Sequence, residues 1–85
     1  MKNWRKTTVA EAEAKYPGKP NVPGMEKPFG YINVKWEALK AEMHPGDELY
    51  AFRSPPESWQ ALAGRMGYAL VRDGRVVREV VTLLN

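Results

Sequence analysis

Residues 46–84, GDELYAFRSPPESWQALAGRMGYALVRDGRVVREVVTLL, hold most of the large apolar side chains and decide the predicted fold. Three runs in this stretch, at 48–53, 68–72 and 75–83, are rich in β-branched and aromatic residues and predict strands. Between the first two, the segment SPPE at 54–57 has a serine, two prolines and a glutamate in the order that starts many helices. It predicts a helix over 55–66, ended by Gly67, and so an α+β fold.

The dipeptide Asp73-Gly74 predicts a two-residue type I′ turn between the last two strands. An unbroken ladder from that turn places residues 72, 71, 70, 69 and 68 opposite residues 75, 76, 77, 78 and 79. One face of the resulting hairpin is strongly apolar and is expected to meet the helices. Its members are Tyr68, Leu70, Val77, Val81 and Leu83.

The short connections around the 55–66 helix indicate that this helix returns along the sheet, which would make the first two strands parallel with a right-handed crossover. The 75–83 strand is the longest and the most continuously apolar, as central strands are. We therefore predict a three-stranded sheet in a split β-α-β arrangement with the last strand in the centre. A meander in the order first, second, third is the alternative.

The first half of the chain predicts two further helices and a loop. Thr8 and Glu11 have capping-box spacing and predict a helix over 9–16, which Pro17-Gly18 ends. Residues 17–30 contain four prolines and three glycines and predict an extended arm. Apolar residues at helical spacing predict a helix over 34–43 with a core-facing stripe of Ile32, Trp36, Leu39 and Met43.

The length of 85 residues indicates a single domain over 1–85, with residues 1–31 as an N-terminal helix and arm and residues 32–85 as the folded core. The chain has no cysteine, which excludes disulfides, thiolate metal ligands and cysteine nucleophiles. It has one histidine, His44, which is expected to cap the C-terminus of the 34–43 helix. We expect no bound metal and no cofactor.

An enzyme is not expected, because Ser54 and Ser58 are the only serines and Ser54 is assigned to a helix cap. The N-terminal sixteen residues are charged throughout and lack an apolar run of signal-peptide length. The apolar runs near the C-terminus are interrupted by Arg78 and Glu79. We therefore expect a cytoplasmic protein without membrane contact.

The leading functional hypothesis is a small protein-interaction or oligomerisation module. The 48–53 strand is apolar on both faces and would lie at the edge of the predicted sheet, where a partner strand can add. Its candidate partner surface is Tyr50, Phe52 and Arg53. The alternative is weak binding of RNA or single-stranded DNA at the hairpin end, with candidate phosphate contacts Arg72, Arg75 and Arg78.

The second half also resembles a group of small uncharacterised bacterial proteins that share the pattern DELY-F-SPPESW-LAGR-GYALVRDG-VV. The resemblance spans residues 46–85, a little under half of the sequence, and the matching segments within it are 47–52, 54–59, 62–65 and 67–77. The resemblance implies a bacterial or phage origin and a common fold. It implies no activity and no functional residue.

Overall fold

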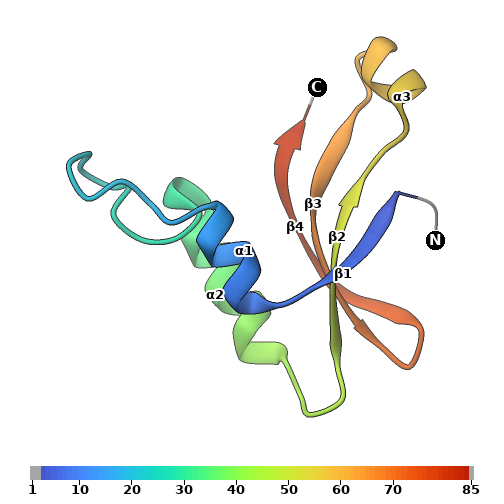
Figure 1. Cartoon of the computed structure of the whole chain (residues 1–85), viewed down its shortest axis with the longest axis horizontal. Coiled ribbons are helices and arrows are strands. Elements are labelled where there is room, and N and C mark those ends of the chain that lie inside the picture. Colours follow the sequence, from blue (N-terminus) through green and yellow to red (C-terminus); the bar gives the residue numbers. More distant parts are fainter. Residues whose placement is uncertain (1–2, 85) are drawn as a thin grey trace.

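A four-stranded antiparallel sheet with two helices against one of its faces forms the fold (Figure 1). The computed structural model describes residues 3–84. The elements in chain order are β1 (Trp4–Thr7), α1 (Val9–Lys15), the 3₁₀ turn η1 (Gly30–Ile32), α2 (Asn33–Glu42), β2 (Glu48–Arg53), α3 (Pro56–Gln60), β3 (Arg65–Arg72) and β4 (Arg75–Leu84).

The α+β class agrees with the prediction, but the predicted three-stranded split β-α-β sheet is wrong. The strand order is β1-β2-β3-β4 and every neighbouring pair is antiparallel, so β3 and not the last strand lies between β2 and β4. The three predicted strands follow the meander order that was the alternative. The fourth strand, β1, comes from the charged N-terminal segment and was not predicted.

The predicted 55–66 helix is also wrong, and the absence of this long helix explains why β2 and β3 are antiparallel and not parallel. Only the five residues of α3 are helical, and Leu62 soon after them has a positive φ of 60°. Ser54 does not cap this helix but joins β2 to β3, because its hydroxyl accepts from the Arg65 N–H at 2.7 Å and its own N–H donates to the Arg65 carbonyl at 2.8 Å. The segment is therefore the loop of a hairpin rather than a crossover.

The Asp73-Gly74 turn is confirmed, but the register beyond it is not. Both residues have positive φ, 53° and 77°, and residues 72 and 71 face 75 and 76 as predicted. A bulge between Leu70 and Val71 then brings Leu70 opposite Arg78 instead of Val77. The predicted apolar face is consequently wrong for Val77 and Leu83, which are exposed, whereas Val80 enters the core.

The helices α1 and α2 form largely as predicted. Thr8 caps α1 by accepting the Glu11 N–H at 3.1 Å. The core lies between these helices and the sheet, with Trp36, Leu39, Leu70 and Val80 as its largest fully buried side chains. The rings of Tyr16, Phe29, Trp36 and Tyr68 pack together there, which ties the residues following α1 and the residues preceding η1 to the sheet.

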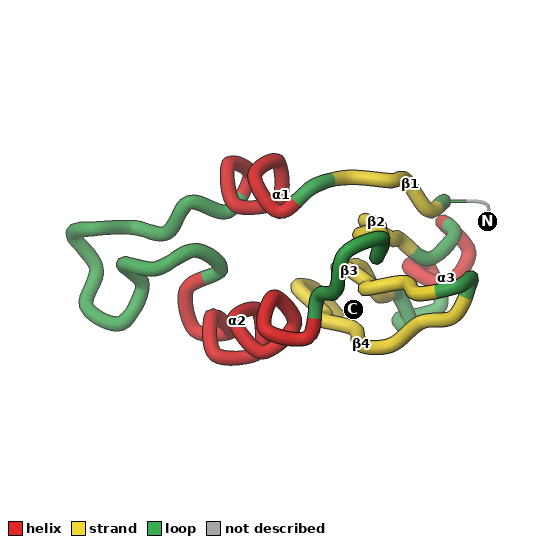
Figure 2. The backbone as a smooth tube through the Cα atoms, turned by 90° about the horizontal axis from the view of Figure 1, so that it is seen from below, coloured by secondary structure: helices red, strands yellow, loops and turns green. Residues whose placement is uncertain are grey.

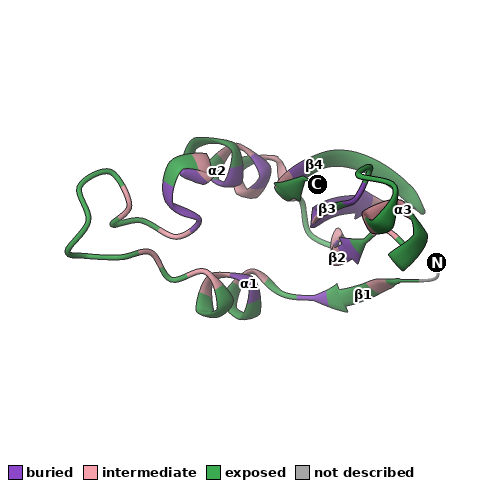
Figure 3. Ribbon diagram, turned by 90° about the horizontal axis from the view of Figure 1, so that it is seen from above, coloured by how far each residue is buried: buried purple, intermediate pink, exposed green. Residues whose placement is uncertain are grey.

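The opposite face of the sheet is buried by curvature. Phe52, Ala69 and Val71 are all less than one-tenth exposed, although α1 and α2 pack on the other face. Figure 3 shows β4 arching over β3, which folds this face inward. The Trp4 ring stacks on Phe52 with 5.2 Å between ring centroids, so the short β1 closes the remaining side.

Candidate interaction surfaces

The predicted partner surface on β2 does not lie at a sheet edge. β1 pairs with β2 from Trp4 opposite Phe52 to Thr7 opposite Leu49, so the backbone of β2 is hydrogen-bonded on both sides. Phe52 is only 7% exposed. The structure therefore places Tyr50, Phe52 and Arg53 on an inner strand, where Phe52 is buried and only the side chains of Tyr50 and Arg53 are open to a partner.

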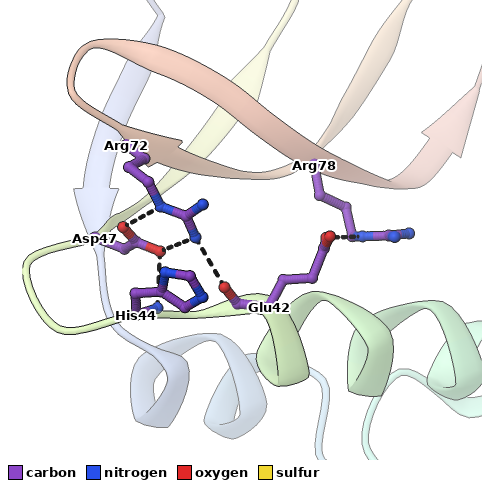
Figure 4. A network of polar contacts seen from close by, with 5 residues as sticks. All are labelled: Glu42, His44, Asp47, Arg72 and Arg78. Carbon is purple, nitrogen blue, oxygen red and sulfur yellow. Dashed lines mark hydrogen bonds and ion pairs between the residues drawn. The ribbon is translucent and has the colours of Figure 1, made fainter.

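The three arginines predicted to contact phosphate are brought to the same hairpin, but two of them are occupied (Figure 4). Arg72 binds both carboxylate oxygens of Asp47, at 2.9 and 2.8 Å, and donates to the Glu42 carbonyl oxygen. Arg78 pairs with the Glu42 carboxylate. Arg75 is exposed and has no ion pair within residues 3–84.

These contacts fasten the end of α2 to the β3–β4 hairpin. The side chain of Asp47 is 2% exposed, whereas that of Arg72 is 33% exposed. The pKa of Asp47 is lowered from its ordinary value of 3.8 to about 2. The largest cause is the hydrogen bonding of its carboxylate by the Arg72 guanidinium, and the second is the hydrogen bond from the backbone N–H of His44. His44 contributes this backbone N–H from the loop that follows α2. The fastening of α2 to the hairpin is sufficient to explain why these charged residues are present, without a ligand.

The two edges of the sheet differ in a way that bears on association. β1 is four residues long, and Arg5 and Lys6 occupy its middle positions. Lys6 pairs with Glu48 of the neighbouring strand at 2.9 Å. A short edge strand that carries exposed cations resists pairing with another chain, because a partner strand would have to desolvate those charges.

β4 is the other edge, and it is ten residues long. Within residues 3–84 its backbone is hydrogen-bonded to β3 alone. Figure 2 shows β1 and β4 at opposite ends of the row of strands, with α2 beside β4 on the helix-covered side. Much of the apolar surface of β4 is open to solvent, at Val76 (45% exposed), Val77 (38%), Leu83 (51%) and Leu84 (70%).

A long, unpaired edge strand with exposed apolar side chains is the arrangement that adds another strand most readily. Sequence reasoning had identified β4 but placed it in the centre of the sheet. The signals that were missed are the segment WRKT at residues 4–7, whose pairing removes β2 from the edge, and the hairpin loop after β2, which puts β3 in the middle and leaves β4 at the edge.

Among residues 3–84 no group of three or more His, Cys, Asp or Glu side chains is arranged to hold a metal ion. No helix in the described part of the chain is long and apolar enough to cross a membrane.

Comparisons with protein-family models, with curated proteins and with solved structures found no match to this chain. The resemblance of residues 46–85 to small bacterial proteins therefore stays a prediction.

Proposed function

We propose that this protein is a small oligomerisation module in which β4 pairs with β4 of a second copy. The observation that supports the proposal is the contrast between the two edges: β1 is short and basic, whereas β4 is long, exposes apolar side chains and has no backbone partner on its outer side among the described residues. Antiparallel pairing of the two β4 strands would continue the sheet from four strands to eight across a two-fold axis.

The two-fold axis restricts the register of such a pair. With the axis perpendicular to the sheet, side chains that lie opposite each other in the two copies must point to the same face of the sheet. The axis therefore passes between one residue of β4 and the same residue of the second copy. An axis through Arg78 or Glu79 would place like charges directly opposite each other, which is unfavourable. An axis through Val80 avoids both pairs, since Arg78 then lies opposite Thr82 and Glu79 opposite Val81.

The Val80 register also covers the exposed apolar side chains. It brings Val77 of one copy near Leu83 of the second copy, and Val76 near Leu84, at both ends of the interface. These are the four β4 side chains with the largest exposed apolar surface. This register keeps like charges apart and brings the exposed apolar side chains of the two copies together, which favours a second copy over an unrelated partner.

Sedimentation velocity tests the proposal with one variant and one control. Leu83→Lys adds a charge at the predicted interface, and because Leu83 is half exposed, the variant is expected to fold normally. Val34→Lys makes the same kind of change on α2, where Val34 is 79% exposed. We expect the wild type and Val34→Lys to sediment as dimers and Leu83→Lys as a monomer. Dissociation of Val34→Lys, or an intact Leu83→Lys dimer, would refute the β4 interface.

The alternative function, weak nucleic-acid binding at the hairpin end, is less well supported. Of its three candidate phosphate contacts, Arg72 and Arg78 already have carboxylate partners, which a phosphate would have to displace. Arg75 alone offers an unpaired guanidinium in the described part of the hairpin. Loss of oligonucleotide binding in Arg75→Gln is the measurement that would favour this alternative.

A further inference from the structure

A pocket with mainly apolar walls lies between the end of α1, the proline- and glycine-rich arm, η1 and Thr82 of β4. Its volume is about 430 Å³, which falls in the range of small-molecule sites. The proposed dimer does not use it, because the four β4 side chains that would meet in the dimer do not line the pocket. An apolar pocket of this size with a few polar groups at its border is where a small-molecule ligand is expected.

The arm that forms one wall of the pocket is folded by its own backbone. The Lys19 N–H donates to the Met25 carbonyl oxygen, and the Phe29 N–H donates to the Tyr16 carbonyl oxygen at 3.0 Å. Figure 2 shows the arm as the long loop that joins α1 to α2 at the end of the helices away from the sheet. Residues 16–29 contain no helix or strand, and connections of that length in a small domain are usually functional.

The apolar wall of the pocket is continuous with the protein core. The Tyr16 ring stacks on the buried Phe29 ring with 5.0 Å between centroids. The Met25 side chain lies over Gly30, since a Cβ at Gly30 would be 2.7 Å from Met25 Cε. Ile32 is half-buried and packs against the core cluster. Because these residues are held by the core and the folded arm, the pocket is largely preformed and favours a ligand with an apolar body.

Positive charge borders this apolar wall. Lys15 and Lys19 line the pocket, both are exposed, and neither forms an ion pair within residues 3–84. No Asp or Glu of the described chain lines it. Lys6 and Lys40, in contrast, are paired with glutamates. Two unpaired ammonium groups beside an apolar wall favour a ligand that carries one anionic group, because no neighbouring acid cancels their attraction.

We propose that this pocket binds a small amphiphilic carboxylate, such as a medium-chain fatty acid. The apolar chain lies against Tyr16, Met25 and Phe29, and Lys15 and Lys19 hold the carboxylate. A single copy of the chain supplies all of these groups.

Isothermal titration calorimetry with octanoate tests the pocket. Burial of most of the octanoate chain predicts one site per chain with a Kd of about 100 µM. Two further probes separate the two parts of the ligand. 1-Octanol has the same chain without the charge and should bind about tenfold more weakly, whereas acetate has the charge without the chain and should give no binding heat at the same concentrations.

A double variant tests the role of the cations. Lys15→Gln/Lys19→Gln should weaken octanoate binding about tenfold and change 1-octanol binding by less than about twofold. Lys27→Gln/Lys35→Gln is the matched control, because it removes two exposed cations that do not line the pocket. It should leave the affinity for octanoate within about twofold of the wild type. Circular dichroism verifies that the variants are folded.

Two single variants complete the test. Met25→Ala removes part of the apolar wall and should weaken octanoate and 1-octanol by the same factor, about threefold to tenfold. Leu83→Lys should bind octanoate as the wild type does, because Leu83 does not line the pocket. The pocket and the dimer can therefore fail independently of each other.

Four results would overturn the proposal. They are no octanoate binding up to about 1 mM, equal affinities for octanoate and 1-octanol, displacement of octanoate by equal concentrations of acetate, and an equal loss of binding in the control double variant. Loss of octanoate binding in Leu83→Lys would contradict a site that a single copy of the chain supplies.

Discussion

Replacement of Trp36 by alanine should remove a large part of the stability of this protein. Trp36 is 0% exposed and lies between α2 and the sheet. Its ring centroid is 4.3 Å from that of Phe29 and 5.7 Å from that of Tyr68. Its Nε1–H also donates to the Glu13 carboxylate at 2.8 Å, which links α2 to α1. One side chain therefore joins three parts of the fold.

The expected cost of Trp36→Ala follows from these contacts. Truncation of a buried tryptophan to alanine costs about 3–5 kcal/mol, and the better helix propensity of alanine returns only about 0.5 kcal/mol. A domain of 85 residues has a total unfolding free energy of roughly 4–13 kcal/mol. The variant should thus lose about a fifth of its stability or more. Trp36→Phe keeps a ring but loses the bond to Glu13, and should cost about 1–2 kcal/mol.

Urea denaturation followed by far-UV circular dichroism measures these differences without relying on tryptophan fluorescence. Val34→Ala is the control, because it lies on the same helix with its side chain 79% exposed. It should shift the unfolding free energy by no more than about 0.5 kcal/mol. A loss below about 1 kcal/mol for Trp36→Ala would refute the packing of α2 on the sheet.

Three further changes test the hairpin and the network beside it. The pKa of Asp47 in the folded protein is lowered to about 2, so its contribution to stability is present above its ordinary pKa of 3.8 and is lost as the pH falls towards 2. In acid denaturation, the difference in stability between the wild type and Asp47→Asn should therefore shrink over that pH interval. Gly67→Ala should destabilise by about 1–3 kcal/mol, because a Cβ there would lie 2.1 Å from the Val80 carbonyl oxygen; wild-type stability in urea would contradict the close β3–β4 approach. Gly74→Ala meets no atom within 4 Å but has a φ of +77°, so it should cost about 1–2 kcal/mol through backbone strain alone, and Gly74→Asn should recover part of this loss.

Local signals in the sequence predicted the elements that depend on local interactions. The Thr8 cap, the apolar stripe of α2 and the positive φ values of Asp73-Gly74 each follow from side chains a few residues apart. These features need no knowledge of the rest of the fold, and all three are present. The buried positions Trp36 and Leu39 follow from the same stripe.

Features set by long-range contacts could not be derived in this way. The SPPE segment has the pattern of a long helix, yet Ser54 bonds to Arg65 across the sheet and α3 ends at Gln60. β1 has no alternation of apolar and polar residues, and it forms a strand because Trp4 packs on Phe52. Tertiary packing overrides local propensity at both places.

Gly67 is the sequence signal for the irregular register between β3 and β4. Gly67 was assigned to the end of a helix, whereas it lies in β3 against the backbone of Val80 and Val81, next to a shift in the ladder. A glycine within a strand often signals a bulge or a close backbone approach. This interpretation would have indicated that the β4 face does not follow simple alternation.

The candidate interaction surface lies on β4 and not on the predicted 48–53 strand, again because of long-range contacts. Apolar residues on both faces of 48–53 indicated an exposed edge, but curvature of the sheet and β1 bury that strand on both sides. The exposed edge is β4, and the sequence does identify it as long and apolar. Only the strand order, which depends on β1 and on the hairpin loop at 54–64, determines which apolar strand is left without a neighbour.

Sedimentation velocity of the wild-type protein over a range of concentrations tests the central claim, the pairing of β4 with a second copy, most directly. We predict a dimer that dissociates on dilution and that Leu83→Lys abolishes. A Kd of about 100 µM corresponds to only about 5.5 kcal/mol, little for a pair of ten-residue strands. A wild-type protein that remains a monomer up to about 100 µM would contradict the claim.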